Sequence, residues 1–293
     1  MIAGPTAVGK TTLAIEIAIH FGTEIISADS RQFYKEMNIG TAKPTAVELA
    51  QVKHHFIDNL SVTDYYTAGM FEKEALKCAE ELFKKYPVLV MVGGSGLFIQ
   101  SFCNGMDEIE PSDLKIREEL NNTLTKSGLE YLQERLKVLD PEYYLQVDLK
   151  NPQRVIRALE VCISTGKPYS SFRTKTKAER DFNIVKIGLN TSREVLYERI
   201  NKRVDDMMQA GLLEEVRGLY PDRELNALQT VGYTELFDYL DTKIPLGEAI
   251  ALIKRNSRRY AKRQLTWFKR DPEIVWFEPS QLQDILNYIH QKI

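Results

Sequence analysis

The sequence has few cysteines, almost no net charge and no long apolar run. Its three cysteines, Cys78, Cys103 and Cys162, are far apart and form no CxxC pair, which suits a reducing cytosol and excludes an obvious zinc site. With a formal net charge of −2, any contact with nucleic acid must come from a local basic patch. No apolar segment approaches the roughly 18 residues that span a membrane. We therefore expect a cytoplasmic protein with no membrane partner. We also expect a monomer.

What the sequence does contain is a phosphate-binding loop at residues 4–11, which read GPTAVGKT. Such a loop wraps backbone N–H groups around phosphate oxygens and directs a helix N-terminus at them. We expect Lys10 to add a point charge and the Thr11 hydroxyl to hold Mg²⁺ between the oxygens. Because only Met1–Ala3 precede the loop, the first strand is very short or the chain has lost its first residues. The residues expected to bind a diphosphate or nucleotide are Gly4, Pro5, Thr6, Ala7, Val8, Gly9, Lys10 and Thr11.

The hydrophobic pattern after the loop alternates between helices and strands. Residues 10–21 and 71–85 have a helical pattern, whereas residues 24–28 have that of a short strand and residues 87–92 form a continuous apolar run. This alternation predicts an α/β fold, in which a parallel sheet is flanked by helices on both faces. Ligands of such sheets bind at the carboxyl ends of the strands. The three segments expected to converge there are Gly4–Thr11, Asp29–Gln32 and Gly93–Ser95.

From about residue 107 the pattern becomes almost wholly helical. Asn151 and Pro152 are a typical helix start, with Asn as the N-cap and Pro in the first turn. A strand pattern returns near residue 182, and Thr191-x-x-Glu194 predicts a capping box for another long helix. The sequence therefore predicts a catalytic core, residues 1–106 and 182–293, with a helical insertion at 107–181.

A protein that hydrolyses ATP or GTP needs an acidic residue at the end of a second apolar strand. Here the strand at 88–92 ends in Gly93-Gly94, and Asn201–Asp205 is one residue too long for a guanine-reading motif. The pattern favours a site that grips phosphates and releases them as a leaving group. Asp29, at a strand end beside the loop, either caps the next turn or accepts a proton from a nucleophile that faces the phosphate.

A basic segment lies near the C-terminus. Of the 17 residues from Lys254 to Arg270, eight are basic, none is acidic and three are aromatic. Basic side chains suit a phosphate backbone and aromatic rings suit unstacked bases, although a solvated helix with Leu265 and Phe268 in the core would give a similar pattern. Arg154 and Arg157 are three residues apart and share a helix face. A phosphate site is thus combined with surfaces suited to RNA.

Several short stretches, in order over nearly the whole chain, form one pattern: GPTAVGKT at 4–11, ISADSRQFY at 26–34, MNIGTAKP at 37–44, HHFID at 54–58, VGGSGLF at 92–98, NPQRVIRALEV at 151–161, EEVRGL at 214–219, TVGYTEL at 230–236 and KRQLTWFKR at 262–270. Together these stretches resemble the bacterial tRNA dimethylallyltransferases, also called tRNA isopentenyltransferases. The family's first strand is truncated here, the segment after HHFID is shorter than expected, and the zinc-finger extension of eukaryotic relatives is absent.

The resemblance implies that the phosphate belongs to dimethylallyl diphosphate and leaves as diphosphate. The acceptor would be N6 of the adenine immediately 3′ of a tRNA anticodon, flipped out of its stack. Asp29 would accept the N6 proton, whereas Lys10, Thr11 with Mg²⁺, and Arg217 would stabilise the leaving diphosphate.

The resemblance also implies contacts with the tRNA anticodon stem-loop, and we expect the insertion and the basic segment to clamp it from two sides. We expect His54 and His55 to be structural. Two alternatives stay open: a P-loop kinase of a small metabolite or nucleotide, and a non-catalytic RNA-binding protein switched by nucleotide. The residues expected to contact tRNA are Asp29, Ser30, Arg31, Gln32, Ser95, Arg117, Gln153, Arg154, Val155, Ile156, Arg157, Gly232 and Arg263.

Overall fold

The structure is a computed structural model, which describes residues 1–107, 109, 113–174 and 177–293. The chain divides into two compact units. The first consists of Met1–Asn104 and Arg180–Ile293, and the second consists of Gly105–Glu179. Among the described residues, no helix is long and apolar enough to cross a membrane.

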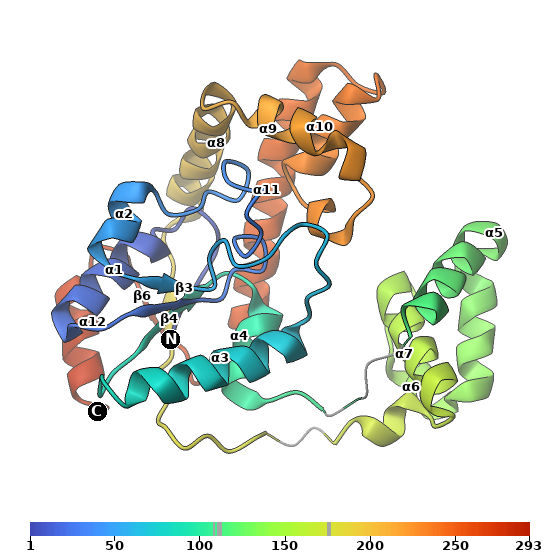
Figure 1. Ribbon diagram of the computed structural model, residues 1–293, viewed down its shortest axis with the longest axis horizontal. Helices are drawn as coiled ribbons and strands as arrows, with labels where there is room; N and C mark the ends of the chain where they lie inside the picture. Colours follow the sequence, from blue (N-terminus) through green and yellow to red (C-terminus); the bar gives the residue numbers. More distant parts are fainter. Residues whose placement is uncertain (108, 110–112, 175–176) are drawn as a thin grey trace. The chain divides into compact units, whose positions relative to one another are not determined.

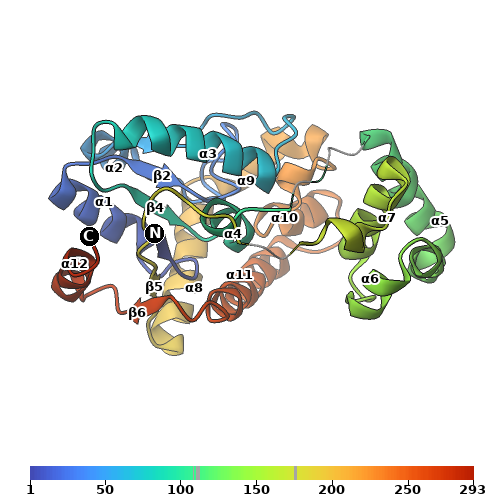
Figure 2. The same cartoon turned by 90° about the horizontal axis from the view of Figure 1, so that it is seen from below.

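The first unit contains a six-stranded parallel sheet in the order β3-β2-β4-β1-β5-β6. Figure 2 shows β2, β4, β5 and β6 in this sequence across the sheet. The predicted parallel sheet is confirmed, but β3 and β6, of two and three residues, were not predicted from the sequence. The strands are β1 (Ile2–Ala3), β2 (Ile25–Ser27), β3 (His54–His55), β4 (Val90–Gly93), β5 (Ile187–Leu189) and β6 (Val275–Phe277).

Helices cover both faces of this sheet, as predicted (Figure 1). Apolar residues of α1, α8 and α12 pack on one face, and those of α3 and α4 pack on the other. A third cluster joins α8, α9, α10 and α11 beyond the sheet. The helices of this unit are α1 (Lys10–Phe21), α2 (Ala46–Gln51), α3 (Ala68–Phe83), α4 (Gly96–Asn104), α8 (Arg193–Gln209), α9 (Leu212–Leu219), α10 (Tyr233–Leu240), α11 (Leu246–Phe268) and α12 (Leu282–His290).

Local side-chain chemistry fixes where several elements begin. The N-cap of α8 is Ser192, whose hydroxyl accepts from Val195 N at 3.3 Å, so the capping box predicted at Thr191 is wrong by one residue. The histidines of β3, which we expected to be structural, have local partners: His55 Nε2 lies 2.6 Å from Glu24 Oε2, and His54 Nδ1 lies 2.8 Å from Val52 O. At the end of β4, a Cβ on Gly93 would lie 2.2 Å from Ala28 O, so only glycine allows β2 and β4 to approach so closely.

The second unit is a small helical bundle with its own core. It contains α5 (Leu114–Leu139), α6 (Pro141–Gln146) and α7 (Pro152–Thr165). The predicted start of α7 is confirmed, because the Asn151 side chain accepts from Arg154 N at 3.2 Å and Pro152 lies in the first turn. Val155 and Ile156 are 0% and 1% exposed in the core of this unit. The expected tRNA contacts therefore do not extend to these two side chains in this structure.

Candidate active site

The phosphate loop lies between β1 and α1 and has a strained backbone. Gly4, Ala7 and Gly9 have φ values of 154°, 63° and 108°, of which the first and last suit glycine. Lys10 Nζ donates to Pro5 O at 2.8 Å, so the lysine folds back over the loop. Burial lowers the pKa of Lys10 to about 8; the nearby Asp29 carboxylate opposes this shift.

A buried glutamine of α11 joins the phosphate loop to the glycine segment after β4. Gln264 Oε1 accepts from Thr6 N at 2.8 Å, and Gln264 Nε2 donates to Gly94 O at 2.9 Å. A Cβ on Gly94 would lie 2.4 Å from Gln264 Nε2, so a side chain there would displace the carboxamide from its present position. No role for Gln264 was predicted from the sequence. Its signal was a polar residue on the buried stripe of α11, between Ala261 and Phe268.

The segment after β2 reaches the same place. Ser95 Oγ accepts from Ser30 N at 2.9 Å and donates to Ser30 Oγ at 3.0 Å. Together with the bonds of Gln264, this contact brings the three predicted segments to one edge of the sheet.

Asp29 fits both of the roles considered for it. Its Oδ1 accepts from Arg31 N at 3.1 Å, so it caps the turn. Within the described part of the chain, this N–H is the one donor within hydrogen-bond distance of the carboxylate, which leaves Oδ2 as an open acceptor. Burial, together with the Asp29 charge, raises the pKa of Tyr260 to about 12.

Two arginines of α8 that were not predicted from the sequence reach this region. Arg199 Nη1 donates to Val8 O at 3.3 Å, and Arg203 Nη2 donates to Ala42 O at 3.4 Å. Burial lowers the pKa of Arg203, and the Asp29 carboxylate opposes that shift. Their signal was the spacing of four residues, which places two arginines on one helix face. Arg217, in contrast, is 53% exposed on α9 and donates to Glu214 Oε1 at 2.7 Å.

The loop fits a magnesium-bound diphosphate. Thr11 is the second residue of α1 and follows Lys10 directly. Among the described residues, no group of three or more His, Cys, Asp or Glu side chains could hold a metal. Mg²⁺ prefers oxygen ligands and is commonly held by few protein groups plus substrate phosphates, so one hydroxyl beside a phosphate site fits that donor set.

The other residues expected to contact tRNA in the first unit are differently placed. Gly232 is buried, and its N–H donates to Glu235 Oε2 at 2.8 Å. Arg263 is exposed, with its guanidinium carbon 5.7 Å from the centre of the Tyr260 ring. The segment 254–270 thus combines the two alternatives that its pattern allowed, a helix face packed in the core and an exposed basic surface. Phe268 is buried in the core, and Arg263 is at the surface.

In the second unit, two arginines converge on one buried carboxylate. Glu160 is 1% exposed; its Oε1 accepts from Arg117 Nε at 3.0 Å, and its Oε2 accepts from Arg157 Nη1 at 3.1 Å. Burial opposes ionisation, but the two guanidinium groups hold the pKa of Glu160 below its usual value. Gln153 and Arg154 are exposed in the first turns of α7.

Comparison with known proteins decides the family. The family model described as IPP transferase matches residues 32–271. The chain belongs to the IPP transferase family. A protein of Christiangramia forsetii named tRNA dimethylallyltransferase is 57% identical over 293 residues, covering 100% of this chain and 97% of that protein.

Solved structures agree with this IPP transferase assignment. The tRNA isopentenylpyrophosphate transferase of Bacillus halodurans has a TM-score of 0.72 and 38% identity, covering 99% of this chain and 95% of that one. A eukaryotic dimethylallyltransferase described as acting on tRNA has a TM-score of 0.82 and 26% identity, covering 100% of this chain and 79% of that one.

Proposed function

We propose that this chain is a tRNA dimethylallyltransferase, which moves the dimethylallyl group from dimethylallyl diphosphate to N6 of the adenine immediately 3′ of a tRNA anticodon. The observation that carries the proposal is the hydrogen-bonded link between the turn of Asp29 and the phosphate loop: Ser30 bonds to Ser95, and Gln264 joins the glycine segment beside Ser95 to Thr6 of the loop. A proton acceptor therefore lies at the same edge of the sheet as the loop that suits phosphate. The family relationship supports the same reaction class.

The reaction is a substitution at the allylic carbon. The N6 lone pair forms a bond to this carbon, while the bond from carbon to the diphosphate oxygen breaks and its electron pair leaves with diphosphate. N6 is a poor nucleophile because its lone pair is delocalised into the ring. Asp29 accepts the proton that N6 loses, through the carboxylate oxygen that the Arg31 N–H leaves open. The products are N6-dimethylallyl adenine in tRNA and free diphosphate.

The growing charge on diphosphate needs positive partners. The N–H groups of the loop and the Lys10 ammonium stabilise it, and Thr11 would hold Mg²⁺, which neutralises phosphate charge when bound. We place Arg203 in this role, because its Nη2 donates to Ala42 O, the same carbonyl that accepts from Gln32 Nε2 in the turn of Asp29. Arg217, the arginine implied by the family resemblance, forms an ion pair with Glu214 at the surface. Its role in stabilising the diphosphate stays a prediction, which mutagenesis can test.

The tRNA partner binds through its anticodon stem-loop. Near the acceptor base we propose contacts from the segment Asp29–Gln32 and from Ser95, which share hydrogen bonds. The insertion contributes Gln153, Arg154 and Arg157, which begin α7 with one basic face. We propose a monomeric enzyme.

A direct test incubates the protein with undermodified tRNA, carbon-labelled dimethylallyl diphosphate and Mg²⁺, and maps the label by nuclease digestion. We expect label only in the adenine immediately 3′ of the anticodon. A matched tRNA with guanine there should remain unlabelled, and a chelator should suppress the reaction in the parent tRNA. Label elsewhere, or none at all, would sink the proposal.

The same assay with ATP in place of the prenyl donor addresses the alternatives. A P-loop kinase would turn over ATP without tRNA, and a nucleotide-switched RNA-binding protein would bind tRNA but leave it unchanged. We expect neither outcome. The short apolar strand β4 ends in Gly93 rather than in a carboxylate that could secure a nucleotide-bound metal.

A further inference from the structure

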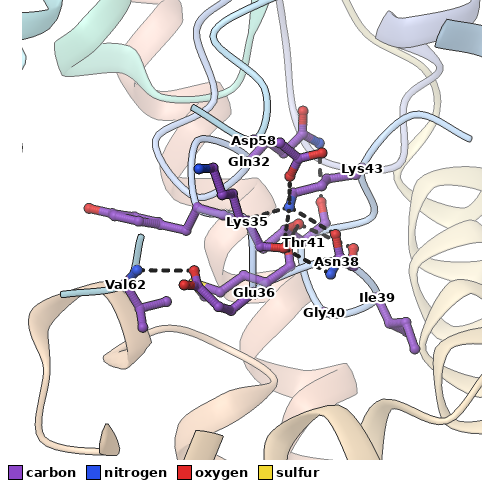
Figure 3. Close-up of polar contacts among 12 residues, drawn as sticks. Gln32, Lys35, Glu36, Asn38, Ile39, Gly40, Thr41, Lys43, Asp58 and Val62 are labelled. Atoms are coloured by element: carbon purple, nitrogen blue, oxygen red, sulfur yellow. Dashed lines mark hydrogen bonds and ion pairs between the residues drawn. The ribbon is translucent and has the colours of Figure 1, made fainter. Parts of the chain in front are cut away.

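Lys43 holds together the loop that connects β2 to α2. Its side chain is only 6% exposed. The ammonium donates to Tyr34 O at 2.6 Å and to Asn38 Oδ1 at 2.9 Å, and it forms an ion pair with Asp58. Figure 3 shows Lys43 between the backbone of this loop and Asp58. A buried lysine with this many partners fixes the path of the chain around it.

The closed loop presents two carbonyl groups to Gln32. Gln32 Nε2 donates to Thr41 O at 3.2 Å and to Ala42 O at 3.1 Å. A carbonyl oxygen can only accept, so these bonds establish which end of the carboxamide is the nitrogen. Ala42 has a φ of 47°, an uncommon value for a residue with a side chain. The loop therefore keeps a strained backbone at the carbonyl that orients Gln32.

The far side of the loop is also anchored. The Glu215 carboxylate of α9 accepts from Ile39 N at 2.8 Å, Gly40 N at 3.0 Å and the Tyr233 hydroxyl at 2.6 Å. A Cβ on Gly40 would lie 2.5 Å from the Tyr233 ring, so the loop is packed against that ring without room for a side chain. With Lys43 on one side and Glu215 on the other, the carbonyls of the loop have fixed positions.

We propose that Lys43 is a positioning residue that makes Gln32 a pure hydrogen-bond acceptor toward the acceptor base, an inference that rests on the proposed function. Both N–H groups of the carboxamide are used by the loop, which leaves its oxygen. The amine of adenine has two N–H groups: Asp29 accepts the proton that is lost, and Gln32 Oε1 accepts the other N–H. Gln32 N donates to Asp29 O at 3.1 Å, so both acceptors belong to one turn.

The arrangement gives base specificity. Guanine has a carbonyl oxygen where adenine has its amine, and that oxygen would face the oxygen of Gln32 without a proton between them. If the carboxamide could turn over, its nitrogen could donate to guanine. Lys43 prevents the turn by holding the carbonyls of Thr41 and Ala42 in place.

The experiment compares Lys43→Met, which keeps the length of the side chain and removes its donors, with Lys35→Met. Lys35 is an exposed lysine of the same loop, so this control changes net charge equally. Binding is measured for two anticodon stem-loops that differ only in adenine or guanine at the acceptor position, and kcat and KM are measured for the adenine substrate. Thermal melting of each variant monitors the fold.

We expect Lys43→Met to reduce the preference for adenine about tenfold and to lower kcat/KM by a similar factor, whereas Lys35→Met keeps the parental preference. Lys43→Arg should restore part of it. A folded Lys43→Met protein with the parental preference overturns the inference. If Lys43→Met does not fold, Asp58→Asn, at the 46% exposed partner, is measured in the same way, and an unchanged preference again overturns it. A parent protein that transfers no prenyl group would instead contradict the proposed function.

Discussion

The positive charges near the phosphate loop of the first unit and those on α7 of the second unit are held in two different ways. In the first unit, Lys10 and Arg203 donate to the backbone carbonyls of Pro5 and Ala42. In the second unit, two arginines share the buried carboxylate of Glu160. A carbonyl is a neutral partner, so it positions a cation without cancelling its charge. A carboxylate positions two cations but cancels one of their charges.

This difference suits two kinds of anion. A diphosphate is compact and gains charge as it leaves, so it is best stabilised by cations that keep their full charge and are partly buried. An RNA backbone is extended and remains hydrated, so exposed cations that displace counterions are sufficient. This difference is why we propose the reaction site in the first unit and an RNA-docking surface in the second.

The largest effect should come from the proton acceptor in the first unit. We expect Asp29→Ala to reduce turnover by roughly 10²–10⁴-fold, the range for a general base, while inhibition by pyrophosphate changes little. Steady-state prenyl transfer and pyrophosphate inhibition measure the two effects separately. Transfer at the parental rate would leave Asp29 only as the cap of its turn.

A smaller effect should come from the cations beside it. Lys10→Ala and Arg203→Ala should each weaken pyrophosphate inhibition about 10- to 100-fold, because a hydrogen bond to a charged group contributes roughly 1.5–3 kcal/mol. Arg217→Ala is the comparison variant, because Arg217 forms an ion pair with Glu214 at the surface. If Arg217→Ala weakens inhibition and Arg203→Ala does not, the diphosphate lies nearer α9 than we propose.

The pH dependence should report the burial of Lys10. Its pKa of about 8 lies below the ordinary value of 10.5 because burial disfavours the charged form. Lys10 is therefore cationic below pH 8 and loses its charge as the pH rises, so pyrophosphate affinity should fall up to about tenfold per pH unit above that point. Titration of Lys10→Arg should lack this step, because arginine keeps its charge. Parallel profiles for the two proteins would contradict the assignment.

The smallest effects should distinguish two arginines of α7, the exposed Arg154 and Arg157, which is paired with Glu160. Arg154→Ala should reduce the dependence of log tRNA affinity on log salt by about one unit without altering thermal melting. Arg157→Ala removes a partner of the buried Glu160, so it should also destabilise the protein by roughly 1–3 kcal/mol. Parental affinity for both variants at every salt concentration would place the tRNA surface elsewhere.

The sequence predicted the parts of the site that follow local rules. Glycine spacing located the phosphate loop, and the end of a strand located Asp29. It did not predict Gln264 and Arg203, because their roles depend on how α11 and α8 pack against the loop. It also gave no sign that Lys43 is buried, since a lysine in a polar loop is ordinarily exposed.

The most direct test of the account follows both halves of the donor at once. Dimethylallyl diphosphate labelled with carbon-14 in the prenyl group and phosphorus-32 in the diphosphate is incubated with tRNA, Mg²⁺ and either the parent protein or Asp29→Asn. The account predicts that, with the parent, carbon label enters tRNA and an equal amount of phosphorus label appears as pyrophosphate, and that both fall together in the variant. Phosphorus label in tRNA, or pyrophosphate released without prenyl transfer, would contradict it.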